Sequence, residues 1–387
     1  MSTQPATGRR LYHLDALRSA AILYGVLVHT ATLGVTWPLT VVSDISGYFR
    51  MGTFFMVSGF FGAMVLARSG TAIFLKKRAL ALLVPLVCGL LLLNPFTNWL
   101  VWNWHNPPLP LQDFLQRAWA GSLPQPHKGP MIWHLHLWFL ISLSFYALMA
   151  PVAVMLAQRL GWAVIPLADR LARLPGWLCV MMTALLVALT SLGLRVFYEI
   201  ALERVLPHDG WNIPWLARTT FYYWPMFLTG MVVFHHAAFA ARFQTISLPA
   251  LALGGVAVIV TRETMVQDGM VWEVVQLLTR ALLTVSAIAA LMAAFGRWFA
   301  KPGFLSRSAD AVYSIYILHF LLIYLIASAL RPFGLPEVPR FLLVAGCTIA
   351  GLFALHRLVI KPSALLGLMF NGKPFPARKR PVKAGPA

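Results

Sequence analysis

Residues 14–34 read LDALRSAAILYGVLVHTATLG, an apolar run long enough to cross a bilayer as a helix. Similar apolar stretches recur along the whole chain, separated by short polar segments. We predict spans at residues 17–36, 47–67, 79–100, 134–157, 177–197, 219–239, 246–262, 272–295, 311–330 and 339–360. The sequence therefore predicts an all-α fold, a polytopic bundle of about ten transmembrane helices.

The composition excludes a soluble globular domain and predicts the lipid bilayer as a partner. Of the 387 residues, 59% are hydrophobic and only 11% are charged, whereas soluble domains carry about a quarter charged residues. The formal net charge of +19 would suggest a nucleic-acid partner in a soluble protein. Here the Lys and Arg residues lie in short loops and form no basic stripe, so we expect no nucleic acid as a partner.

The distribution of basic residues predicts how the chain is oriented. An even number of spans places both termini on one side, and most Lys and Arg residues then fall in segments on that side. By the positive-inside rule, both termini are expected to be cytoplasmic. We expect a cytoplasmic N-terminal segment at residues 1–16, a transmembrane domain at 17–362 and a basic, disordered cytoplasmic tail at 363–387.

The three cysteines predict neither a disulfide framework nor a metal site. Cys88, Cys179 and Cys347 all lie in apolar segments, their number is odd, and no pair has the spacing of zinc ligands. We therefore expect no bound metal.

The first span carries three polar residues that point to a function. Arg18 and His29 are eleven residues apart, which is three helical turns plus about 20°, so both side chains share one face about 16 Å apart. Asp15 lies one turn before Arg18. Arg18 as a snorkelling anchor and His29 as a helix–helix hydrogen-bonding group are the alternatives. The shared face favours a functional pair.

Two later spans also contain candidate residues. His136 and Trp138 open the fourth span, where they would meet a substrate at the outer mouth or serve as interfacial residues. Tyr316 and His319 lie in the ninth span, with His319 near mid-membrane. For His319, helix packing and catalysis are both open.

The second span and the turn after it hold the remaining candidates. Ser58 precedes a glycine in an apolar helix, which favours close helix packing over a serine nucleophile, because no nucleophile-elbow context surrounds it. Lys76, Lys77 and Arg78 cluster at the inner face. They either orient the span or bind the phosphates of a cytoplasmic donor.

Several motifs in one order resemble the acyltransferase-3 family of integral membrane acyltransferases, and within it the osmoregulated periplasmic glucan succinyltransferases. In chain order they are LDALR at 14–18 followed after ten residues by His29, FFMVSGF at 54–60, KKRALALLVP at 76–85, HLWFL at 136–140, and the set Ser314, Tyr316 and His319. The sequence departs from the family at one point: the basic turn often has a second arginine three residues after the first, and here Ala81 follows Arg78 at that distance.

The resemblance implies O-acyl transfer across a bacterial inner membrane. It implies a cytoplasmic acyl-CoA as co-substrate, a succinyl or acetyl group, no bound cofactor, and a carbohydrate hydroxyl as acceptor, with a periplasmic glucan the expected one. On this hypothesis His29 is the general base, since its unperturbed pKa is near neutrality. Arg18 would hold the donor and Asp15 would orient Arg18.

Further hypotheses concern the residues that contact the donor and the acceptor, and the class of protein to which the chain belongs. Lys76, Lys77 and Arg78 would bind the donor, and His136, Trp138, Ser58, Tyr316 and His319 would contact substrate. A succinyl carboxylate would need a basic partner such as Arg50 or Arg280.

Two alternative functions remain open. The first is a transporter or flippase for a sugar or an acylated metabolite, although the sequence shows no pair of related halves. The second is a non-catalytic scaffold, which would not need Arg18 and His29 on one face of the first span.

Overall fold

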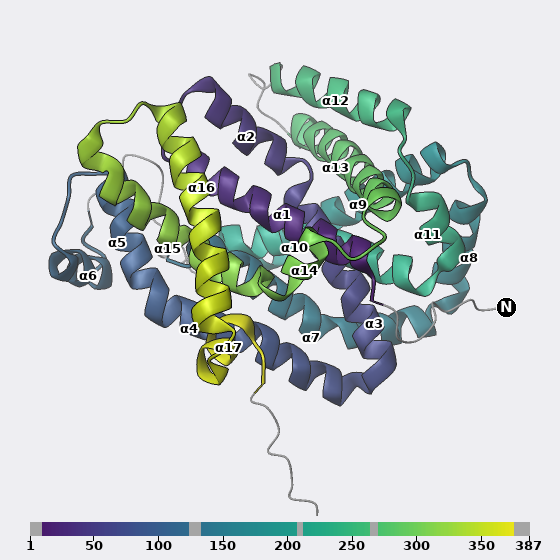
Figure 1. Cartoon of the computed structure of the whole chain (residues 1–387). Coiled ribbons are helices and arrows are strands. Elements are labelled where there is room, and N and C mark those ends of the chain that lie inside the picture. Colours follow the sequence, from purple (N-terminus) through teal and green to yellow (C-terminus); the bar gives the residue numbers. More distant parts are fainter. Residues whose placement is uncertain (1–9, 124–132, 207–211, 264–269, 375–387) are drawn as a thin grey trace, which may run out of the picture.

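A computed structural model describes residues 10–123, 133–206, 212–263 and 270–374 (Figure 1). Within these ranges the regular structure is entirely helical, and no strand occurs. The all-α prediction is therefore confirmed. Residues 1–9 of the predicted N-terminal segment and residues 375–387 of the predicted disordered tail lie outside the described residues.

The α-helices are α1 (Tyr12–Ala31), α2 (Trp37–Gly47), α3 (Arg50–Arg78), α4 (Val84–Cys88), α5 (Asn94–His105), α6 (Leu111–Trp119), α7 (Trp138–Arg159), α8 (Gly161–Arg173), α9 (Gly176–Phe197), α10 (Ile213–His235), α11 (Ala237–Phe243), α12 (Leu248–Glu263), α13 (Met270–Trp298), α14 (Phe304–Arg307), α15 (Val312–Leu330), α16 (Glu337–Leu355) and α17 (Ala364–Asn371). Wider π-type turns at Ala79–Leu83, Gly89–Leu93, Tyr198–Leu202 and His356–Ile360 adjoin α4, α5, α9 and α16.

The helices identify a multi-pass membrane protein. In the described residues six helical runs are long and apolar enough to cross a membrane: Trp37–His105, Leu135–Arg159, Gly176–Leu202, Val271–Trp298, Val312–Phe333 and Glu337–Ile360. Helices α10 and α11, bent by 120°, make a seventh if they count as one span. The predicted number of ten spans and the orientation of the termini stay predictions.

The difference in number has a physical reason. The first run is 69 residues long, whereas one crossing needs only about 20. It is interrupted at Gly70, whose φ of 70° no other residue type adopts readily, so it contains two of the predicted spans. The predicted first span corresponds to α1, where Asp15 and Arg18 reduce the apolar character.

Helix α1 lies inside the bundle, in contact with α3, α13, α15 and α16 (Figure 1). Helix α3 in turn packs closely against α10. A Cβ built on Gly59 would lie 2.0 Å from the carbonyl oxygen of Phe227, and one on Gly230 would lie 1.9 Å from that of Met56. Only glycine permits such close backbone approach. This contact explains the small residue after Ser58 as a packing site.

Two predicted boundaries need correction. Helix α1 begins at Tyr12, within the segment expected to precede the first span. The expected tail begins with helix α17, whose first turn is capped by the Ser363 hydroxyl accepting from the backbone N–H of Leu366. Residues 364–370 read ALLGLMF and are apolar, so they pack against α4 and α15 instead of remaining unstructured.

Candidate active site

One face of α1 lines two cavities that adjoin end to end. Arg18 lines the first cavity, His29 lines the second, and Ile22 lines both. Three other side chains also belong to both linings: Phe54, Phe139 and Tyr316. The eleven-residue spacing thus places a cation and a histidine in neighbouring chambers, with an apolar and aromatic constriction between them.

The second cavity contains three histidines from three different helical segments. The ring centroid of His29 is 5.1 Å from that of His319 and 6.4 Å from that of His136. The rings of His136 and His319 are 4.8 Å apart. All three line the same space together with Trp138. The structure therefore brings together residues from three distant parts of the sequence: His29, the pair His136 and Trp138, and His319.

Hydrogen bonds fix the imidazole of His319 and the backbone of His136. Nδ1 of His319 lies 2.6 Å from the carbonyl oxygen of Tyr316 and must donate to it, because a carbonyl only accepts. This leaves Nε2 of His319 as an acceptor, and it is buried without a partner among the described residues. The Tyr316 hydroxyl donates to the carbonyl oxygen of His136, which anchors the start of α7.

The histidine cavity also contains an arginine whose position the sequence did not reveal. Arg50 opens α3 and lines the cavity beside His29. A Cβ on Gly25 would lie 2.7 Å from Nη1 of Arg50, so the glycine in α1 makes room for the guanidinium. The described residues lining this cavity include no carboxylate. The signal available in the sequence was Gly25, a small residue on the helix face between Arg18 and His29. A glycine there indicates that another group packs close to α1, but it does not identify that group as Arg50.

The first cavity contains two arginines. Arg18 and Arg78 line it, and Ser58 also faces it. The Arg18 guanidinium lies 5.7 Å from the ring centre of Phe61, and that of Arg78 lies 5.5 Å from the ring centre of Phe74. Nε of Arg18 is buried without a hydrogen-bond partner among the described residues. Two cations in one partly apolar chamber form a site suited to an anion.

The three residues of the predicted basic cluster at the end of α3 do not all face the first cavity. Arg78 faces the first cavity, whereas Lys76 and Lys77 are exposed and do not line it. Successive residues on a helix point in directions about 100° apart, so three consecutive cations cannot all face one cavity. Arg78 is thus the member of the cluster that accompanies Arg18.

Asp15 contacts Arg18 less closely than its role as an orienting group would require. Its Oδ2 accepts a hydrogen bond of 2.7 Å from Nε of Arg10, while Nη2 of Arg18 lies 3.6 Å from its Oδ1, an ion pair without a hydrogen bond. Arg10 precedes the helix and reaches the carboxylate more directly. Nη2 of Arg18 instead donates to the carbonyl oxygen of Ala309 at 3.3 Å.

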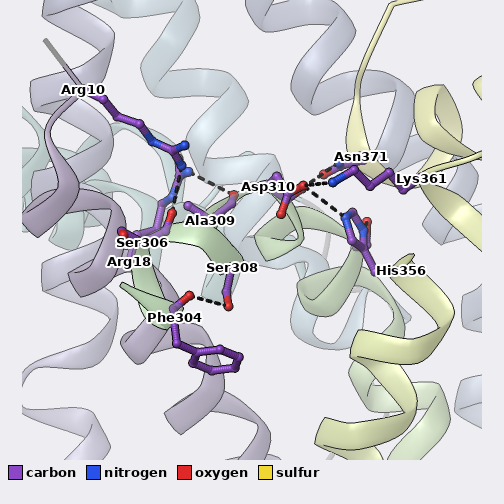
Figure 2. A network of polar contacts seen from close by, with 11 residues as sticks. Arg10, Arg18, Phe304, Ser306, Ser308, Ala309, Asp310, His356, Lys361 and Asn371 are labelled. Atoms are coloured by element: carbon purple, nitrogen blue, oxygen red, sulfur yellow. Dashed lines mark hydrogen bonds and ion pairs between the residues drawn. The ribbon is translucent and has the colours of Figure 1, made fainter. Parts of the chain in front are cut away.

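Figure 2 shows residues 304–310, the segment between α13 and α15 whose carbonyl oxygens accept hydrogen bonds from Arg10 and Arg18. Arg10 donates to the carbonyl oxygen of Ser306. At the other end, Asp310 accepts a hydrogen bond from Lys361 at 3.0 Å and its carbonyl oxygen accepts from Asn371. The segment thus connects α1 to the C-terminal helices.

Comparison with known proteins identifies the family. The acyltransferase domain family, acyltransferase-3, matches residues 11–357, which include both cavities. The chain belongs to this family. The resemblance drawn from the sequence motifs to this family of acyltransferases is confirmed. In the described residues no group of three or more His, Cys, Asp or Glu side chains is arranged to hold a metal ion.

Curated relatives of this acyltransferase carry a more specific name. The chain is similar to the glucans biosynthesis protein C of Salmonella agona (strain SL483) and that of Salmonella paratyphi A (strain ATCC 9150 / SARB42), with 25% identity over 263 residues in each case. These matches cover 63% of this chain and 63% of the relative's length. No solved structure matches the chain.

Proposed function

We propose that this acyltransferase moves a succinyl group from a cytoplasmic acyl-CoA to a hydroxyl of a periplasmic glucan, in the inner membrane of a bacterium. The observation that carries the proposal is the pair of adjoining cavities, with two arginines in one and three histidines in the other. The name of the Salmonella relatives supports a glucan as the acceptor.

The arginine cavity fits the phosphate end of the donor. Arg18 and Arg78 offer several N–H donors in fixed planes, the arrangement that recognises phosphate groups best. From Arg18 to His29 the distance along α1 is about 16 Å. A long, thin thioester arm would bridge this distance by passing Ile22, Phe54, Phe139 and Tyr316, the side chains common to both cavities.

The histidine cavity supplies the base that a sugar hydroxyl requires. In the proposed reaction, the hydroxyl oxygen attacks the thioester carbonyl carbon while a neutral His29 accepts its proton. The tetrahedral intermediate then collapses, the C–S bond breaks and the ester forms. The protonated His29 returns the proton to the departing thiolate, so coenzyme A leaves as the thiol. His319, whose Nε2 faces no described partner, would orient His29 or the acceptor.

Arg50 supports a dicarboxylic acyl group. It lies in the histidine cavity, where no described lining residue carries a negative charge. A buried cation without a counter-ion is costly, and a substrate carboxylate would supply one. The free carboxylate of a succinyl group would occupy this position while its thioester end faces His29. An acetyl group lacks the carboxylate, which is why succinyl is favoured here.

The test is acyl transfer by purified protein in liposomes. Labelled succinyl-CoA or acetyl-CoA is supplied on one side and a panel of glucans on the other. The proposal predicts label on a glucan, with succinyl-CoA the better donor. Transfer of unmodified glucan across the bilayer without label would contradict the proposal and favour the transporter.

A further inference from the structure

A third cavity opens between α2, α12 and α13, away from the arginine and histidine cavities. Its volume is about 360 Å³, and its lining includes Ser43, Asp44, Tyr48, Thr261, Gln276 and Arg280. The volume falls in the range of about 300–1,000 Å³ that is typical of small-molecule sites. The cavity is therefore large enough for one sugar ring, and its lining combines polar and apolar surface in similar amounts.

The position of Arg280 is unusual for a residue without a function. It lies ten residues into α13, inside the candidate span Val271–Trp298. Its side chain is exposed, and among the described residues it has no ion-pair partner. A cation at such a depth is costly and generally marks a binding site or a transport path. Because Arg280 does not line the histidine cavity, it is separated from the acyl group.

Two aromatic side chains, Tyr223 and Trp138, relate Arg280 of this cavity to the histidine cavity. Tyr223 is an electrostatic neighbour of both Arg280 and Arg50. Its ring is stacked on Trp138 at 6.1 Å between centroids, and Trp138 lines the histidine cavity. Tyr48, in the lining of the third cavity, precedes Arg50 by two residues. The third cavity and the histidine cavity therefore have neighbouring residues in common, Tyr223 and the segment from Tyr48 to Arg50.

We infer that the third cavity binds a glucose unit of the acceptor glucan and directs its chain toward the histidines, an inference that rests on the proposed function. The lining fits a carbohydrate because it combines hydroxyl, amide, carboxylate and guanidinium groups with an aromatic ring. Sugars are bound by many hydrogen bonds and by packing of C–H faces on aromatic rings. A phospholipid headgroup would use Arg280 but would not need Gln276, Thr261 and Tyr48.

The first test fills the cavity without disturbing the helices. A Cβ on Gly47 meets no atom within 4 Å, so Gly47→Trp places an indole in the cavity without a backbone clash. Gly255→Trp is the matched control, because Gly255 in α12 is equally open and lies outside the cavity lining. We expect the KM for glucan to rise about tenfold or more in Gly47→Trp, as the loss of a few hydrogen bonds implies, with the KM for acyl-CoA unchanged.

A second pair of variants tests the polar contacts. Arg280→Gln should raise the KM for glucan, whereas Arg297→Gln, at the far end of the same helix and exposed, should not. Slow hydrolysis of acyl-CoA in the absence of glucan should be equal in all variants. An unchanged KM for glucan in both Gly47→Trp and Arg280→Gln would overturn the inference.

A binding measurement separates the inference from the proposed function. A glucose hexasaccharide with a photoreactive group is cross-linked to the wild-type protein in liposomes, and the labelled peptides are mapped. Labelling of α2, α12 and α13 that unlabelled hexasaccharide displaces supports the site even if no acyl transfer is found. Labelling elsewhere, or displacement by phospholipid instead of hexasaccharide, contradicts it.

Discussion

His29 and His319 face each other in one cavity, with their ring centroids 5.1 Å apart. The two residues come from α1 and α15, which are almost 300 positions apart in the chain. His319 is held through Nδ1, so its Nε2 is left to accept a proton. No such hydrogen bond anchors the His29 imidazole among the described residues, and its ring packs against those of His319, His136 and Phe320. This combination suits a proton-accepting base assisted by a fixed neighbour.

The two arginines of the first cavity should govern the affinity for the donor. We expect Arg78→Gln to raise the KM for acyl-CoA by about 10–100-fold, because a charge-assisted contact to phosphate is lost. Lys76→Gln removes the same charge two residues away, where the side chain is exposed, and should change the KM less than about twofold. Steady-state kinetics over a range of acyl-CoA concentrations measures both. Equal effects of the two substitutions would show that only the general charge of this face matters.

Arg50 should select the acyl group. Arg50→Gln is expected to lower kcat/KM for succinyl-CoA by about 100-fold, the cost of leaving one buried charge unpaired, and to change that for acetyl-CoA much less. Competition between the two labelled donors measures the ratio directly, and Arg50→Lys should retain part of the preference. An equal loss with both donors would mean that Arg50 acts on the reacting carbonyl or on the fold.

The close contact of α3 with α10 should be sensitive to one methyl group. Gly59→Ala is expected to destabilise the protein by about 1–3 kcal/mol, since the new Cβ would overlap the Phe227 carbonyl. Gly193→Ala in α9 is the control, because its Cβ meets nothing within 4 Å and alanine favours a helix. Unfolding in mixed micelles by increasing the fraction of SDS measures both. Equal stability of the two variants would refute the predicted close contact.

Asp310 should contribute a stability that depends on pH. Burial alone would raise the pKa of this carboxyl, but the hydrogen bond from Lys361 and the positive charges of Lys361, His356 and Lys373 outweigh it and lower the pKa below 3.8. A lowered pKa in the folded state stabilises the protein above the unfolded-state value, and this stabilisation is lost as the pH falls through the folded-state pKa. Asp310→Asn should therefore lower the thermal midpoint at pH 7.

The same variant provides its own control at low pH. The difference in thermal midpoint between wild type and Asp310→Asn should begin to shrink as the pH falls below about 4, where the unfolded chain protonates this carboxyl first. The difference should vanish once the pH has passed below the lowered folded-state pKa. A difference that stays constant from pH 7 to pH 3.5 would mean that the carboxylate charge contributes nothing to stability.

The sequence predicted what lies within one helix better than what packing brings together. Arg18 and His29 share a face because both belong to α1, and helical geometry alone determines this. The convergence of His136 and His319 on His29 depends on how α7 and α15 pack against α1, which no periodicity reports. The sequence offers Arg50 only as one possible partner of a succinyl carboxylate, because its place beside His29 depends on the space that Gly25 leaves in another helix.

The errors at the chain boundaries have a similar origin. Helix α17 lies in a stretch expected to be disordered because basic and proline residues follow it. Its own residues are apolar and bury against α4, a contact that the local composition does not reveal. The all-helical fold, in contrast, follows from composition and segment length, because a chain this apolar must satisfy its backbone hydrogen bonds within helices.

The most direct test of the histidine mechanism is the rate of acyl transfer by His29→Ala in liposomes, with succinyl-CoA and glucan at saturating concentrations. If His29 is the general base, kcat should fall by about 10²–10⁴-fold, while the KM for acyl-CoA and the thermal midpoint stay close to the wild-type values. A kcat within a few-fold of wild type, in protein shown to be folded, would contradict the proposed mechanism.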